Sequence, residues 1–165
     1  MWMAGHGDAI TMKYFTNLVA ELNIGHRVKF IGKHTRNETF ALMQRATAII
    51  SPSVFDEPFG NTNIEAMASG TALIASRSGA IEEIVDHGKS GLIYDRFNTE
   101  ELAFHMKLVL KNRDLRRTLQ IEGQKRVKEM FTQNQIILQV EQKLAQISDT
   151  HLEVAVNEGV RVSLQ

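Results

Sequence analysis

The sequence predicts an α/β domain with a doubly wound, Rossmann-like parallel sheet and helices on both faces. Short apolar runs alternate with longer segments of helical periodicity along most of the chain. Residues 46–50 form an apolar run, and residues 72–75 are apolar without alternation, as a strand that is buried on both faces requires. Glycine or proline ends most of these segments. In such a sheet, ligands bind at the carboxyl ends of the strands.

The first third of the chain already shows this alternation. Residues 2–4 are predicted to end a strand, and a tight turn at Gly5 and Gly7 leads into a helix that Gly25 terminates. The apolar positions of that helix recur at helical spacing: Phe15, Leu18, Val19 and Leu22. Residues 27–32 form the next predicted strand.

The centre of the chain carries the predicted functional segment. A helix over residues 36–45 leads to a central strand at residues 46–50, and an irregular segment then precedes a helix from about Asn61 to Gly70. This connection from strand through loop to helix places the free N–H groups of the first helical turn at the end of the strand. Because the helix dipole favours negative charge there, the position suits a phosphate.

Two carboxylates, Glu57 and Glu65, are expected to flank that helix end. Glu65 lies one turn from Asn61 and projects toward the same crevice as Glu57. A carboxylate suits the vicinal hydroxyls of a sugar, because hydroxyls donate hydrogen bonds. Sugar plus phosphate is therefore the ligand that this chemistry describes. An alternative is that Thr62 and Glu65 form a capping box, which satisfies the first backbone donors of the helix and binds nothing.

The second half of the chain completes the pattern. A buried strand at residues 72–75, a turn at Gly79, a short helix through Val85 and a last strand at residues 91–94 are predicted. Helices follow from about residue 98 onward. One of them is rich in cations: Arg113, Arg116, Arg117, Lys125, Arg126 and Lys128. Such a run is a solvated face or, as an alternative, a contact with an anionic membrane surface.

The tail, residues 148–165, is predicted to be separate from a domain at residues 1–147, because the composition changes there. Residues 152–156 and 160–164 alternate around a turn with Gly159, which predicts a β-hairpin.

Bulk composition limits the kind of partner. The formal net charge is +0, so no global field favours nucleic acid, and the absence of cysteine excludes disulfides and thiolate chemistry. The six histidines form no ligand cluster, so no metal site is expected. No apolar run approaches the ~20 residues of a spanning helix, and the first residues do not resemble a signal peptide. We therefore expect a cytoplasmic protein with a small-molecule partner.

The run Glu57-Pro58-Phe59-Gly60 with a second acid at Glu65 resembles the E-x7-E signature of retaining glycosyltransferases of the family 4 type, whose GT-B fold has two Rossmann-like domains. Further segments resemble the C-terminal, donor-binding domain of that family in order and spacing: Pro52-Ser53, Glu65 to Gly70, Leu73 to Ser76, Gly79 with Glu83, and Gly88 to Ile93. The resemblance covers residues 1–147. Ala80 departs from it, since the family usually has a second glycine there.

The resemblance implies a hexosyltransferase of polysaccharide or lipopolysaccharide biosynthesis, which transfers a sugar from a UDP- or GDP-linked donor to a saccharide or lipid-linked acceptor without a metal or other cofactor. By resemblance, Glu57 is the catalytic residue and contacts the donor sugar, while Glu65 holds the ribose hydroxyls. The donor-binding residues expected are Lys33, His34, Glu57, Pro58, Phe59, Gly60, Asn61, Thr62 and Glu65. His34, placed near the base, also fits a solvated loop histidine.

The resemblance also implies missing parts. These are an N-terminal acceptor domain and the first strand of the donor domain, with the arginine and lysine that clamp the diphosphate. That strand would be central, between the strand ending at Ala4 and the strand at residues 46–50. We expect the tail hairpin or a second copy of the chain to cover the exposed edges, the latter giving a homodimer.

The expected function is that of the donor-binding half of a retaining glycosyltransferase, and the isolated chain is expected to bind a nucleotide sugar without catalysing transfer. Alternatives are a nucleotide-sugar-binding module that belongs to no active enzyme, and a nucleotide-sugar epimerase or glycogen-type synthase on the same fold. The expected location is the cytoplasm, with peripheral contact to the inner membrane face as an alternative.

Overall fold

The computed structural model describes the backbone of residues 1–157 and the side chains of residues 1–147. The strands within this part are β1 Trp2–Ala4, β2 Lys29–Gly32, β3 Ala48–Ser51, β4 Ala72–Ser76 and β5 Leu92–Tyr94. The helices are α1 Ala9–Glu21, α2 Arg36–Arg45, α3 Asn61–Ala68, α4 Ile81–Ile84, α5 Thr99–Lys111, α6 Arg113–Met130 and α7 Gln133–Asn157. All paired strands are parallel, which confirms the predicted α/β class.

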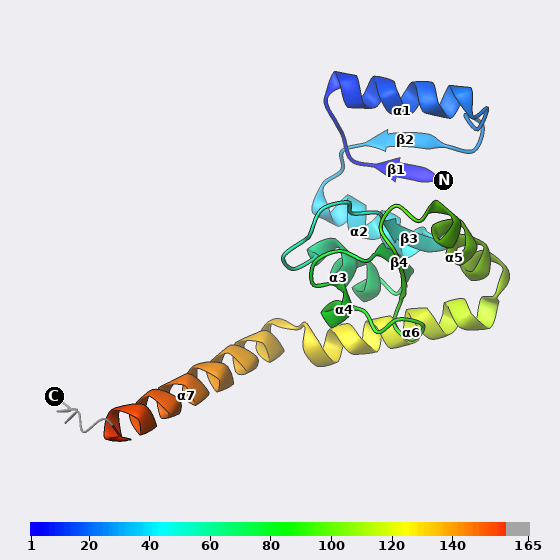
Figure 1. Cartoon of the computed structure of the whole chain (residues 1–165). Helices are drawn as coiled ribbons and strands as arrows, with labels where there is room; N and C mark the ends of the chain where they lie inside the picture. Colours follow the sequence, from blue (N-terminus) through cyan, green and yellow to red (C-terminus); the bar gives the residue numbers. More distant parts are fainter. Residues whose placement is uncertain (158–165) are drawn as a thin grey trace.

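The strands form two sheets rather than the single sheet expected. One has the order β1-β2 and the other β3-β4-β5. In the doubly wound order 3-2-1-4-5-6, removal of strand 1 leaves 3-2 and 4-5-6, which is the arrangement found. Figure 1 shows α1, β2 and β1 in a layer separate from β3, β4 and the helices around them. The division therefore falls where the absent central strand was predicted, because no described strand pairs with both β1 and β3.

The three-stranded sheet is covered by helices on both faces. Along β4, alternate side chains point to opposite faces, as the period of a strand requires. Leu73 and Ala75 join a core with Ala66 and Met67 of α3, whereas Ala72 and Ile74 belong to a second core. That second core contains residues of α5 and α6: Val109, Leu119 and, partly buried, Leu102, Met106, Leu108 and Leu115. The buried core of the fold thus lies around β4.

The β1–α1–β2 unit is packed much less completely. Helix α1 contains no buried residue. Its apolar residues Ile10 and Tyr14 are 83% and 61% exposed, and Trp2 of β1 is 57% exposed. By contrast, all five residues of β4 are buried. The apolar pattern of α1 predicts a buried face that the described residues cover only in part, since Leu18 and Val19 are partly buried and Phe15 and Leu22 are exposed.

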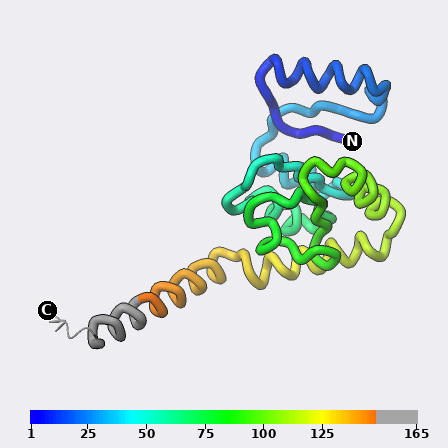
Figure 2. The backbone as a smooth tube through the Cα atoms, in the orientation of Figure 1, coloured from blue at the N-terminus to red at the C-terminus, as the bar shows by residue number. Residues whose placement is uncertain are grey.

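The predicted C-terminal hairpin is wrong. Helix α7 runs from Gln133 to Asn157, so residues 152–156, the first arm of the hairpin, are helical. The second arm, residues 160–164, lies outside the described residues. A helix that has formed extends at little cost per residue, whereas an isolated two-stranded hairpin is only marginally stable. The helix continues through residues 147 and 148, and Figure 2 shows it leading away from the rest of the molecule.

Two of the clustered cations on α6 bind helix ends inside the domain. Arg116 donates to the carbonyl of Val109 at 2.9 Å, and Arg126 donates to the carbonyls of Ile84 at 2.7 Å and Glu83 at 2.8 Å. A guanidinium is well suited to the free carbonyls at a helix C-terminus. These two arginines therefore have structural partners. No helix in the described part of the chain combines the length and hydropathy needed to cross a membrane.

Candidate functional site

The loop that follows β3 ends in a helix terminus with free backbone donors. Gly60 is the N-cap of α3 and has φ 67° and ψ 47°, in the left-handed region that glycine tolerates. The N–H groups of Asn63 and Ile64 bond to the carbonyl of Gly60. The amides of Asn61 and Thr62, earlier in the same turn, have no intrahelical partner. With no side-chain cap, these donors stay available for an anion.

The capping-box alternative for Glu65 is wrong. Since Gly60 is the N-cap, Thr62 lies inside the helix, and no side chain within the described part of the chain caps α3. Oε1 of Glu65 instead accepts from Arg36, at 3.0 Å from Nε and 2.8 Å from Nη2. The Glu65 side chain is 31% exposed. Its carboxylate is therefore accessible and is not used to terminate the helix.

Glu57 is held by groups from its own loop and from the loop after β4. Its Oε1 accepts a hydrogen bond from Oγ of Ser53, and its carbonyl accepts from the N–H of Ala80 at 3.3 Å. Gly79 has φ +50°, and a Cβ on it would lie 2.1 Å from the Glu57 carbonyl oxygen. Only glycine permits this approach. Ala80 has φ −79°, which alanine adopts readily, so the departure from the family pattern leaves the turn intact.

A second set of contacts joins the loops after β3, β4 and β5. Oδ1 of Asp56 accepts from the N–H of Gly79 at 3.1 Å and lies 3.0 Å from Nη2 of Arg96. Nη1 of Arg96 also donates to the carbonyl of Val54 at 3.4 Å. The carboxyl ends of three parallel strands are thus tied together, where ligands bind in open α/β sheets. Sequence reasoning missed Asp56 and Arg96, because nothing local distinguishes them from solvated charges.

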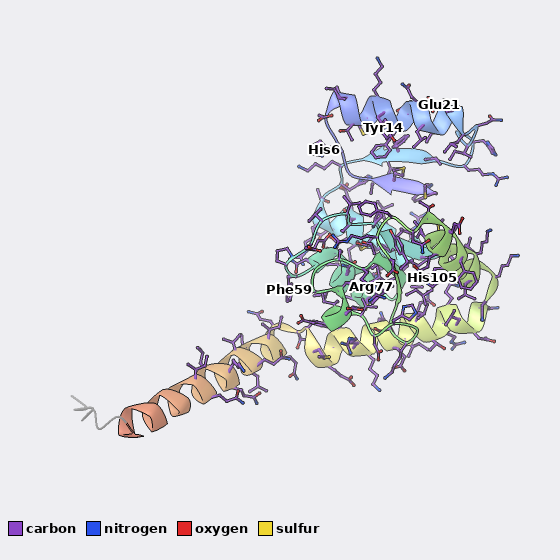
Figure 3. All side chains as sticks on the ribbon, viewed as in Figure 1. His6, Tyr14, Glu21, Phe59, Arg77 and His105 are labelled. Atoms are coloured by element: carbon purple, nitrogen blue, oxygen red, sulfur yellow. The ribbon has the colours of Figure 1, made fainter. Side chains whose placement is uncertain are left out.

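The structure brings Glu57 to the start of α3. A Cβ built on Gly60 would lie 3.5 Å from Oε2 of Glu57 and 2.9 Å from Nδ2 of Asn63. Asn63 is 5% exposed, and its Oδ1 has no hydrogen-bond partner among the described residues. Phe59 is 45% exposed and lies at the edge of the molecule near α3 (Figure 3). A carboxylate oxygen and free amides therefore share one end of the sheet.

The predicted base-binding residues lie after β2, in the loop that leads to α2. The Nε2 atom of His34 is buried and has no hydrogen-bond partner among the side chains and backbone that the structure describes, and its Nδ1 lies 3.9 Å from Oε2 of Glu38. Lys33 is exposed. Thr35 and Glu38 form a capping box at α2, and the backbone N–H of Thr35, followed by its hydroxyl, holds the pKa of Glu38 below its ordinary value. This loop is linked to α3 through Arg36.

A cavity of about 470 Å³ lies between α2 and α3, and its rim includes both Arg36 and Glu65. Other lining residues are Asn37, Phe40, Gln44 and Ile64. Among the side chains that the structure describes, no group of three or more histidines or acids is arranged to hold a metal ion. The charged groups that line this cavity are the carboxylate of Glu65 and the guanidinium of Arg36, whereas Glu57, which was expected to share a crevice with Glu65, is not among its lining residues.

Comparison with known proteins identifies the family. The family model described as glycosyl transferases group 1 matches residues 3–126. The chain belongs to this family. The chain is 29% identical over 143 residues to an uncharacterised glycosyltransferase of Methanocaldococcus jannaschii. The aligned segment covers 87% of this chain and 40% of that protein. It thus spans about two fifths of the length of that relative.

Solved structures place the chain within the GT-B fold. HepE from Anabaena in complex with UDP-glucose matches with a TM-score of 0.77 and 24% identity, over 88% of this chain and 40% of that one. The C-terminal domain of the group 1 family protein LpcC from Francisella tularensis matches with a TM-score of 0.70 and 24% identity, over 76% of this chain and 65% of that one. The chain therefore has the fold of the C-terminal domain of glycosyl transferases group 1 proteins, as the E-x7-E resemblance predicted.

Proposed function

We propose that this chain is the donor-binding half of a retaining glycosyltransferase that transfers a sugar from a nucleoside diphosphate to a saccharide or lipid-linked acceptor. The single observation that carries the proposal is the uncapped start of α3. Free amides face one end of the sheet there, and a carboxylate oxygen of Glu57 lies beside Gly60. The complex of HepE with UDP-glucose supports a UDP-linked donor.

The proposed roles follow from the chemistry of each group. The diphosphate binds at the amides of Asn61 and Thr62, where helix-end donors offset its charge without a metal. Oε2 of Glu57 accepts from hydroxyls of the donor sugar, which makes Glu57 the proposed catalytic residue. Glu65 accepts from the ribose hydroxyls, and Pro58 and Phe59 border the sugar. Lys33 and His34 lie toward the base.

The isolated chain is proposed to bind the donor and to leave catalysis to the complete enzyme. The sheet is divided at the position of the central strand, and the chain spans 40% of the length of its relative from Methanocaldococcus jannaschii. An N-terminal acceptor domain is the proposed partner. A homodimer through the free edges of β1 and β3 is the second proposed partner arrangement. The proposed location is the cytoplasm, with peripheral contact to the inner membrane face as the alternative.

Calorimetry on the full chain with UDP, GDP, UDP-glucose and GDP-mannose tests the proposal. We expect saturable binding of one nucleotide series and no hydrolysis of the donor. Absence of binding in both series would refute donor binding. Turnover by this chain alone would contradict the proposal that catalysis requires the complete enzyme. Conversion of the donor sugar without an acceptor would indicate an epimerase.

A further inference from the structure

Arg36 occupies an unusual position for a cation. It is the first residue of α2, directly after the N-cap Thr35. A positive charge is disfavoured there, because the N-terminus of a helix carries partial positive charge. The side chain is 84% exposed and yet has both Nε and Nη2 on one oxygen of Glu65. The pair joins two helices whose residues are 29 positions apart in the sequence.

This ion pair uses only part of the Glu65 carboxylate. Both nitrogens of Arg36 contact Oε1, at 3.0 and 2.8 Å, and Oε2 has no hydrogen-bond partner among the described residues. A carboxylate that binds a vicinal diol accepts one hydrogen bond on each oxygen. Each carboxylate oxygen offers about two lone-pair sites, and the two nitrogens of Arg36 occupy both of those on Oε1, so a ligand hydroxyl that bonds to Oε1 competes with Arg36. A ligand with a single hydroxyl can use Oε2 and leave the ion pair in place.

We propose that Arg36 is a specificity-determining residue that competes with the ligand's ribose for Glu65. The proposal rests on the proposed function, since it assigns Glu65 to a ribose. In the free protein, Arg36 holds the carboxylate. A ribonucleoside diphosphate displaces the guanidinium because its two hydroxyls replace the lost contacts. A ligand without these hydroxyls binds and leaves the ion pair intact.

The expected size of the effect follows from the exposure of the pair. Arg36 is 84% exposed and Glu65 31% exposed, so solvent screens their attraction. Exposed pairs of this kind change an equilibrium by about two- to fivefold. Loss of Arg36 should therefore tighten ribonucleotide binding by about that factor. If Arg36 instead bound the phosphates, its loss would weaken binding of every nucleotide.

The test uses calorimetry on the full chain with UDP, GDP and their 2′,3′-dideoxy analogues. Arg36→Gln removes the charge at the pair. Arg45→Gln is the matched control, because Arg45 is an exposed arginine at the other end of the same helix. We expect Arg36→Gln to lower the Kd of the ribonucleotide about two- to fivefold and to leave the Kd of the dideoxy analogue unchanged. Arg45→Gln should change neither Kd.

An equal or higher Kd in Arg36→Gln for the ribonucleotide, or the same tightening for the dideoxy analogue, would overturn the competition. If the wild-type chain binds UDP or GDP and Arg36→Gln has no effect, the proposed function stands and this inference fails. If neither the wild type nor Arg36→Gln binds any nucleotide, both fail. Binding by Arg36→Gln alone would support both.

Ionic strength gives a second readout. Uridine and guanosine carry no phosphate, so salt acts on their binding mainly through the protein's own ion pairs. Raising sodium chloride from about 0.05 to about 0.5 M shortens the Debye length from roughly 14 to roughly 4 Å. We expect NMR titrations to show tighter nucleoside binding by the wild type at high salt and no such gain in Arg36→Gln. Equal salt responses in the two proteins would contradict the competition.

Discussion

Replacement of Gly79 by alanine tests whether the close approach of two loops positions Glu57. A Cβ on Gly79 would lie 2.1 Å from the carbonyl oxygen of Glu57 and 2.7 Å from its backbone nitrogen. The backbone of Glu57 would have to retreat by more than about 1 Å to reach an ordinary nonbonded distance. This shift would also disrupt the hydrogen bonds from Gly79 to Asp56 and from Ala80 to Glu57.

The magnitude has two parts. An alanine at φ +50° costs about 1 kcal/mol, because the left-handed region is unfavourable for an L-residue. Overpacking against backbone adds about 1–3 kcal/mol. We therefore expect Gly79→Ala to lose about 2–4 kcal/mol of unfolding free energy. Binding of UDP-glucose should weaken as well, because Glu57 moves away from the start of α3.

Gly88 offers a matched control. It has φ +78°, and a Cβ built on it meets no atom within 4 Å. Gly88→Ala should therefore lose only about 1 kcal/mol and keep its nucleotide affinity. Urea unfolding and calorimetry on both variants measure the difference. Equal unfolding free energies and equal affinities for Gly79→Ala and Gly88→Ala would refute the reasoning.

Three further substitutions test the site and its support. Glu65→Gln keeps the side-chain shape but removes its charge, and we expect UDP affinity to fall about tenfold while the far-UV spectrum stays unchanged. Glu57→Gln should raise the Kd of UDP-glucose and leave that of UDP unchanged in calorimetry, because only the sugar contacts Glu57; a parallel loss for UDP would contradict that role. Arg126→Met removes the bonds to Ile84 and Glu83 at the end of α4 and should cost about 1–3 kcal/mol in urea unfolding, whereas Lys125→Met, at an exposed position of the same helix, should stay within about 0.5 kcal/mol.

The local elements of the fold could be predicted because their signals are local. The apolar run that became β4 is buried on both faces, and the helix predicted from Asn61 begins there. Periodicity and glycine placement act over a few residues, so they are visible in sequence. Local signals failed at residues 152–156, where an alternating pattern lies within α7. Alternation of apolar and polar residues does not by itself distinguish a strand that has no partner from an extension of an existing helix.

The sequence by itself also determined the family and the two acids of the site, because the E-x7-E spacing and its neighbours are contiguous in the chain. Only the tertiary structure decided what those acids contact. Glu65 meets Arg36 from another helix, and Glu57 is packed against the backbone at Gly79. These contacts join residues more than 20 positions apart, and no local pattern encodes them. The division of the sheet between β1 and β3 was likewise decided by the tertiary structure, because pairing between distant strands exists only in the folded chain.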